Sequence, residues 1–408
     1  MIYELFFVLL ILFFILIFYK NNQTLSIIFF YAFIVRLLVI LIDIYFYQIP
    51  FSTLDSIGYE WKAAVWGEYG IAYALNNFNI EGKSFYYSNV LSVVYGAIGR
   101  SILIAKLFSL TASLLVIFLS YKITILVFKD KTSALVVSII LAAFPLFIII
   151  STFTLREIYI LLVFLTSVYF FVHSIQKKFL PSIIFFIISI LISLCHIYLH
   201  GPFVLIIPVF ILIYLLDTCT RVFKSKIYSS ILFFGSISLL SAIFVFFIYD
   251  SILNIEIPYL GKITDKIDVD LLAFIQQHIR NTDYGNTSYP NWFYPNSYFD
   301  IYWLSIVRFF YFLCGPFFAI NFMNLVSFFD GIFYLIFVFF IIYNWKKVLK
   351  NKLTLYLLLM IIPLIILHSW GVNNSGTGMR HRIKFLPILI IIISPYILNF
   401  YYQYIQKK

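Results

Sequence analysis

Apolar runs of about 20 residues recur along the whole chain, and each is long enough to cross a bilayer as an α-helix. Because lipid offers no hydrogen-bond partners, such segments must satisfy their backbone polar groups internally, as helices do. Hydrophobic residues make up 63% of the sequence and charged residues 11%, which leaves too little polar surface for a water-soluble globule. The sequence therefore predicts an all-α, polytopic helical membrane protein.

The apolar runs predict about eleven transmembrane helices. We expect them to form one integral-membrane domain over residues 1–408, with re-entrant or interfacial segments between them. The first run lacks the basic start and the small-residue cleavage site of a signal peptide, so it is expected to remain in the protein. The expected spans are 2–19, 24–47, 101–128, 133–152, 154–174, 180–197, 202–217, 227–249, 329–345, 353–370 and 383–401.

The distribution of lysine and arginine predicts the orientation. An external N-terminus places the basic residues of every short cytoplasmic loop inside, as the positive-inside rule requires. This holds only if residues 301–325 do not cross, so we expect a re-entrant or interfacial hairpin there. Residues 48–100 then form a first external loop, and residues 250–325 a second one that contains the hairpin. The net charge of +11 is interpreted as loop charge beside lipid, and no nucleic-acid partner is expected.

A basic stretch at residues 373–384 lies between two apolar runs, on the expected external side. Arg380, Arg382 and Lys384 stand at alternate positions, and two glycines before them allow a close backbone approach to a ligand. Guanidinium groups bind phosphate in bidentate fashion. The stretch therefore predicts a phosphate or pyrophosphate clamp for a lipid-linked substrate. The alternative is a set of ordinary basic residues that flank a helix.

Two acidic residues lie near the start of the first external loop. Asp55 and Glu60 are candidates for a general base that deprotonates an acceptor hydroxyl. The alternative for Asp55 is a helix N-cap, and the alternative for Glu60 is a solvated helix face. We favour a catalytic role for Asp55 over one for Glu60.

Other charged pairs flank or interrupt the apolar runs. Arg156 and Glu157 stand at the mouth of one span, where they either serve a phosphate or pair with their neighbours. Arg36 and Asp43 are seven residues apart within another span and therefore share one helical face. Because charges inside a bilayer usually pair or line a cavity, we interpret these two as a structural pair.

His196 and His200 are four residues apart, which suits one edge of a metal site or a proton-shuttle pair. No third ligand with matching spacing is evident, and Cys195, Cys219 and Cys314 are too scattered to supply one. Neither a metal nor another cofactor is therefore expected.

The order of several short motifs resembles that of polytopic glycosyltransferases of the GT-C type, among them the O-antigen polymerases of bacterial surface-polysaccharide synthesis. The resemblance covers most of the chain from Arg36 to the last span. The motifs are Asp55-x-x-x-Tyr59-Glu60, Tyr87-Ser-Asn with Gly99-Arg100-Ser, Phe144-Pro145, Leu155-Arg156-Glu157, His200-Gly-Pro, Arg308 with Cys314-Gly-Pro, and Gly376-Thr-Gly-Met-Arg380-His-Arg382.

The resemblance implies a GT-C-like fold in the bacterial inner membrane and chemistry on its periplasmic or outer face. It implies an undecaprenyl phosphate- or pyrophosphate-linked glycan as substrate, with membrane lipid and other polysaccharide-assembly proteins as partners. Asp55 matches the first-loop acid of these enzymes, and Arg380 and Arg382 match a late basic site for the carrier phosphates. We expect the remaining candidates to help bind the substrate: Arg156, Glu157, His200, Arg308 and Lys384.

Three functions remain open at this point. The first is polymerisation of lipid-linked oligosaccharide repeats of O-antigen or capsule. The second is transfer of a single sugar from a polyprenyl-phosphate donor to a glycan, lipid or protein. The third is flipping of a lipid-linked sugar, which ranks last because the candidate charges gather on one expected face and no inverted repeat is evident.

Overall fold

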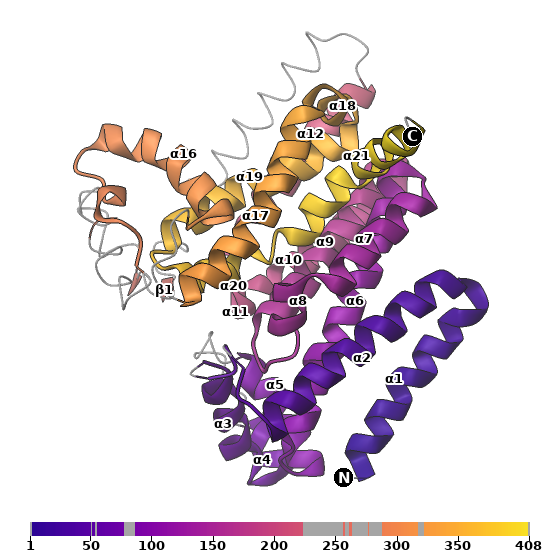
Figure 1. The fold of residues 1–408 in the computed structure, drawn as a ribbon, viewed down its shortest axis with the longest axis vertical. Coiled ribbons are helices and arrows are strands. Elements are labelled where there is room, and N and C mark those ends of the chain that lie inside the picture. Colours follow the sequence, from indigo (N-terminus) through magenta and orange to yellow (C-terminus); the bar gives the residue numbers. More distant parts are fainter. Residues whose placement is uncertain are drawn as a thin grey trace.

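The computed structural model describes residues 2–49, 51–53, 55–76, 86–222, 256–257, 261–262, 276, 288–316 and 322–406. In this part of the chain the protein is a bundle of helices (Figure 1). One antiparallel pair of two-residue strands, β1 (Glu256–Ile257) and β2 (Gly261–Lys262), accompanies them. The prediction of a polytopic helical protein is therefore confirmed at the level of fold class.

The chain starts with a helical hairpin of α1 (Ile2–Asn21) and α2 (Gln23–Tyr45). The Asn22 side chain accepts a hydrogen bond from the backbone N–H of Leu25 and so caps α2. Three further helices lie within the first long loop and gather at one end of the bundle (Figure 1): α3 (Asp55–Gly67), α4 (Gly70–Asn76) and α5 (Tyr86–Ile98). A Cβ at Gly96 would lie 2.7 Å from Ile71 N, so the close approach of α5 to α4 requires glycine.

The centre of the bundle contains α6 (Ile102–Phe128), α7 (Lys131–Ala143), α8 (Pro145–Ile150) and α9 (Glu157–Gln176). Ser101 caps α6 and Asp130 caps α7 through their side-chain oxygens. α7 ends before Pro145, because proline lacks an N–H and clashes with the preceding helical turn. The single span predicted over 133–152 is therefore two shorter helices.

The middle of the chain continues with α10 (Phe179–Leu194), α11 (His196–Leu199), the 3-10 helix η2 (Gly201–Leu205) and α12 (Ile206–Val222). The span predicted over 227–249 lies outside the described residues, as does most of the second long loop. η5 (Asn291–Phe293) precedes α16 (Tyr298–Cys314), which covers the first half of the predicted hairpin and starts with a capping box formed by Ser297 and Asp300. α16 packs on α19 and α17.

The C-terminal part consists of α17 (Phe322–Tyr343), α18 (Trp345–Lys350), α19 (Lys352–Gly371), α20 (Ser375–Arg382) and α21 (Leu386–Gln406). Every residue of α21 from Leu386 to Ser394 is buried, and this helix packs against α6, α7 and α17. A helix that is apolar on all sides suits such a central position.

Among the described residues, seven helices are long and apolar enough to cross a membrane, or up to eight if α20 and α21, bent by 60°, form one broken span. These helices indicate a membrane-embedded protein. The described residues thus contain fewer candidate spans than the eleven predicted. α7 covers only Lys131–Ala143, and one predicted span lies outside the described residues.

Basic residues predicted to be cytoplasmic come together at one end of the bundle. Arg221, in the last turn of α12, donates hydrogen bonds to the carbonyls of Lys177 and Ile175, and Lys352 forms an ion pair with Asp217. α18 and the C-terminus lie at this end, whereas α3, α4 and the N-terminus lie at the other (Figure 1). The arrangement is compatible with the predicted topology.

The charges of α2 do not pair with each other as predicted. Arg36 is fully buried and donates hydrogen bonds to Ser151 Oγ and to the carbonyls of Ala32, Leu141 and Ala142. Asp43 instead forms an ion pair with Lys106 of α6 at 2.5 Å. Both charges are compensated, as burial requires, but the partners come from α6, α7 and the turn after α8, which helical spacing within α2 cannot reveal.

Candidate functional site

Asp55 and Arg380 lie in contact at the end of the bundle that carries α3. Asp55 is in the first turn of α3, and its Oδ2 accepts a 2.5 Å hydrogen bond from Nη1 of Arg380 in α20. The two side chains keep 54% and 21% of their surface exposed, respectively. The pair is therefore accessible to a ligand, and the structure brings together the two residues on which the predicted chemistry most depends.

Hydrogen bonds join the first turn of α3 to the turn before Arg156. Ser56 Oγ and Thr154 Oγ1 are 2.6 Å apart, and Thr154 Oγ1 also donates to the carbonyl of Ser56 at 2.8 Å. Both residues are buried. These bonds fix the start of α3 against the start of α9, which places Asp55 close to the Arg156–Glu157 pair.

The basic stretch forms a helix rather than an extended, glycine-rich clamp. Asn374 caps α20 by accepting a hydrogen bond from Thr377 N at 2.8 Å. Gly378 packs against the protein, where a Cβ would lie 3.1 Å from Tyr289 Oη. Successive residues of a helix are rotated by about 100°, so Arg380 and Arg382 point to nearly opposite sides. The alternate cations therefore cannot act as one clamp.

Arg382 points into the protein core. Its Nε donates to Asp330 Oδ2 at 2.6 Å, and its other nitrogens donate to the carbonyls of Gly315 and Ser327, each at 2.7 Å, and of Leu313 at 3.3 Å. The side chain is 1% exposed. The structure thus gives Arg382 a structural role, in contrast to the predicted phosphate contact.

Arg308 is likewise buried and fully engaged. It donates hydrogen bonds to the carbonyls of Phe293, Ser369 and Val372 and to Asn373 Oδ1, at distances from 2.5 to 3.2 Å. Its guanidinium also stacks over Trp370 at 4.7 Å. Burial lowers the pKa of Arg308 to about 10, so it stays charged at neutral pH. This residue joins α16 to the segment before α20, and its burial and its four hydrogen bonds indicate a structural role.

Glu60 lines a pocket whose wall does not include Asp55. Its carboxylate accepts two hydrogen bonds from Arg100, at 2.8 and 2.9 Å, and one from Tyr95 Oη at 3.0 Å. Burial, and then the neighbouring Glu60, raises the pKa of the Tyr95 hydroxyl. Its oxygens are occupied by these donors in a buried ion pair, so we favour a structural role for Glu60 over the predicted catalytic one.

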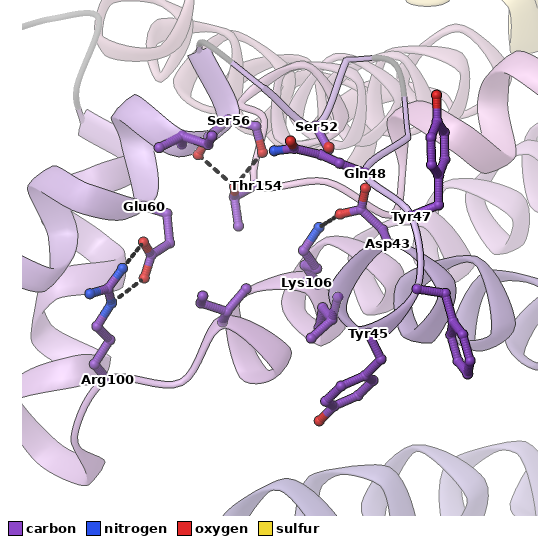
Figure 2. Close-up of a pocket in the computed structure, with 14 residues that line it drawn as sticks. Asp43, Tyr45, Tyr47, Gln48, Ser52, Ser56, Glu60, Arg100, Lys106 and Thr154 are labelled. Carbon is purple, nitrogen blue, oxygen red and sulfur yellow. Dashed lines mark hydrogen bonds and ion pairs between the residues drawn. The ribbon is translucent and has the colours of Figure 1, made fainter.

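That pocket has a volume of about 530 Å³ and lies between the ends of α2, α3 and α6. Figure 2 shows the Glu60–Arg100 and Asp43–Lys106 ion pairs on its wall, with Ser56 and Thr154 between them. Tyr45, Tyr47 and Gln48 also line it. Polar groups combined with aromatic rings suit a carbohydrate, and Ser56 connects the pocket directly to Asp55.

Arg156 and Glu157 approach the site from the start of α9. Arg156 Nη1 has one hydrogen bond, to the carbonyl of Leu199 at 3.4 Å. Glu157 is buried, and its Oε2 has no hydrogen-bond partner among the described residues. Its carboxylate is close enough to interact electrostatically with Arg380 and Lys384. The structure therefore brings both residues into the same cluster as Arg380.

Lys384 lies just after α20 and is fully buried. Its Nζ is 2.9 Å from Nδ1 of His381, and it forms no ion pair within the described ranges. Together with Arg156 and Arg380, this residue gives the cluster three cations from α9, α20 and the turn after α20. The nearby carboxylates are Asp55 and Glu157.

The two histidines paired by spacing do not act together. His196 is buried beside the ring of Phe203, whereas His200 meets His368 of α19, with 3.1 Å between the two Nε2 atoms. His381 of α20 joins them. Burial, and then the nearby Lys384, lowers the pKa of His200 well below its usual value, so its imidazole is neutral at pH 7.

Sequence reasoning missed His368 and His381 as functional residues. Each is near one end of the basic stretch, but no fixed spacing links them to His200, which is 168 residues from His368. The sequence did contain a signal, because one of the six histidines of the chain lies within the stretch that carries the cations and another lies five residues before it. We define the polar cluster as Asp55, Arg156, Glu157, His200, His368, Arg380, His381 and Lys384.

Comparison with protein-family models, with curated proteins and with solved structures finds no match. The polar cluster combines one accessible carboxylate, three cations and three imidazoles at the ends of apolar helices. Such a site can bind an anion and accept a proton.

Proposed function

We propose that the protein is a membrane glycosyltransferase that polymerises oligosaccharide repeats carried on a polyprenyl pyrophosphate, such as the undecaprenyl carrier of O-antigen or capsule synthesis. The observation that carries the proposal is the contact between Asp55 and Arg380. A candidate base and a candidate phosphate ligand, 325 residues apart, meet at an accessible point among further cations.

The cations of the polar cluster suit the donor phosphate. In glycosyl transfer the bond between the anomeric carbon and the phosphate oxygen breaks, and the electron pair stays on the phosphate. Fixed positive groups stabilise this developing charge most effectively when they are preorganised and shielded from water. Arg380 keeps part of its surface exposed, whereas Lys384 is buried behind it. Arg156 completes this set of phosphate-binding residues.

Asp55 suits the role of general base. The acceptor hydroxyl attacks the anomeric carbon, and its proton passes to the Asp55 carboxylate as the new glycosidic bond forms. The hydrogen bond from Arg380 orients the carboxylate. A substrate phosphate that attracts Arg380 would weaken this bond and leave the base free to accept the proton.

The surroundings of the site fit a lipid-linked glycan. The polar cluster lies at the ends of apolar helices, so a polyprenyl tail can remain in lipid while its phosphate reaches Arg380. The pocket of Figure 2 is next to Asp55 through Ser56 and offers polar and aromatic side chains to a sugar chain. We place the site on the periplasmic or outer face of a bacterial inner membrane.

Transfer of a single sugar would use the same groups, and the glycans of a deletion strain separate the two reactions. If the protein polymerises repeats, single repeats on the carrier should accumulate, and mass spectrometry of extracted lipid-linked glycans would detect them. Full-length chains that lack one sugar would indicate a monosaccharide transferase. Unchanged glycans in the deletion strain would contradict both reactions.

A further inference from the structure

Three histidines from three separate elements converge within the polar cluster. His200 lies between α11 and η2, His368 in the last turn of α19, and His381 in α20. One ring nitrogen from each lies within 4.8 Å of the other two, and the Nε2 atoms of His200 and His368 are 3.1 Å apart. Nitrogen ligands about 2.0–2.1 Å from a tetrahedral zinc ion are separated by about 3.4 Å, so small adjustments would complete the geometry.

A backbone contact orients His368 for metal binding. Its Nδ1 is 2.7 Å from the carbonyl oxygen of Leu364. Because a carbonyl only accepts hydrogen bonds, Nδ1 carries the proton, and the lone pair of Nε2 is directed at Nε2 of His200. Histidines that bind metals usually donate their other N–H in this way, which fixes the tautomer and the ring orientation.

The surrounding rings hold the three histidines in place. His368 is 4% exposed, and the rings of Phe203, Phe312 and Phe385 pack around it. Lys384 Nζ faces Nδ1 of His381 at 2.9 Å, and this contact orients the ring. Rigid neighbours of this kind reduce the entropy that ligands lose on binding a metal.

We infer that His200, His368 and His381 bind a divalent transition-metal ion, and that Zn²⁺ is the ion their ligand set fits. Three imidazoles with a fourth position open to water or substrate are typical of catalytic zinc sites. Such a site differs from the sequence-based expectation of no metal, which rested on the absence of a third ligand with matching spacing near His196 and His200.

A role for the metal in catalysis rests on the proposed function. A zinc ion among Arg156, Arg380 and Lys384 would accept an oxygen of the donor phosphate as its fourth ligand and act as a Lewis acid. The nearby carboxylate of Glu157 offsets part of the local positive charge. Metal binding itself does not depend on this role and can be measured without any substrate.

The test measures zinc bound to the purified full-length protein. After chelation and dialysis against Zn²⁺, elemental analysis should find about one zinc per chain. Replacement by Co²⁺ should give the intense visible absorption of a tetrahedral site. His368→Ala and His200→Ala should each lower zinc binding more than tenfold. His200 is only half-buried, so its variant should fold even if that of His368 does not.

The matched control is His173→Ala. His173 lies in the last turn of α9, stacked on Phe185 and outside the polar cluster, so its loss should leave zinc binding unchanged. Absence of zinc from the wild type at saturating Zn²⁺, or wild-type binding by folded His200→Ala, would overturn the inference. Zinc binding without any glycan phenotype in the deletion strain would refute the proposed function alone, whereas transfer that resists chelation would refute the metal's catalytic role.

Discussion

Asp55 accepts a 2.5 Å hydrogen bond from Arg380 across 325 residues of sequence. The first residue begins a short helix in the first long loop, and the second lies in the last turn of a helix that follows α19. Two packing features bring them together: the Ser56–Thr154 bonds at the start of α3 and the cap of α20 at Asn374.

Asp55→Asn should abolish glycan transfer without loss of the folded protein. The amide keeps the shape of the carboxylate and caps a helix nearly as well, but it cannot accept the acceptor's proton. The measurement is polymer length in a deletion strain complemented with the variant. Glu68→Gln, an exposed carboxylate at the end of α3, is the control and should complement fully. Normal chains with Asp55→Asn would show that Asp55 is not the base.

Arg380→Lys should reduce transfer about a hundredfold or more, because loss of a contact that strengthens in the transition state costs roughly 2–4 kcal/mol. Lysine keeps the charge but cannot bind phosphate in bidentate fashion. Arg221→Lys changes the same residue type at the opposite end of the bundle and should have little effect on the rate. Initial rates with a lipid-linked donor at equal protein levels would measure the difference. Equal rates for both variants would exclude a phosphate contact by Arg380.

Arg382→Ala should destabilise the protein rather than alter the transfer chemistry. It leaves Asp330 buried without its partner, and breaking a buried ion pair typically costs about 3–5 kcal/mol. Thermal unfolding in detergent would measure the loss. The double variant Arg382→Met with Asp330→Leu removes both charges and should regain part of the stability. If Arg382→Ala unfolds like the wild type but fails in transfer, Arg382 contacts the substrate after all.

Single cysteines at Glu68 and Lys350 should be labelled from opposite sides of the membrane. Both positions are exposed, and the predicted topology puts Glu68 outside and Lys350 inside. The background needs Cys195→Ser, since Cys195 is exposed whereas Cys219 and Cys314 are buried. An impermeant maleimide should modify Glu68→Cys in intact cells and Lys350→Cys only after permeabilisation. Labelling of both before permeabilisation would contradict the topology.

The sequence by itself determined which segments are helical and apolar. Long apolar runs leave helices as the way to satisfy the backbone in lipid, and caps such as Ser101 and Asp130 mark where helices start. Proline also decided where helices break, which an average of hydropathy over a window conceals. Pro145 divides one predicted span into the two helices α7 and α8. The candidates Asp55, Arg156, Glu157, His200, Arg380 and Lys384 also came from local patterns of charge near span ends.

Only the tertiary structure decided which of these charges meet. Alternation suggested that Arg380 and Arg382 act together, but a helical turn directs one toward Asp55 and the other toward Asp330. Spacing paired His196 with His200, whereas packing of α19 and α20 supplies His368 and His381 instead. Partners of this kind lie far apart in the sequence, and their contact depends on how whole helices pack. Local spacing predicts the helical face on which a side chain lies, but it does not predict which helix packs against that face.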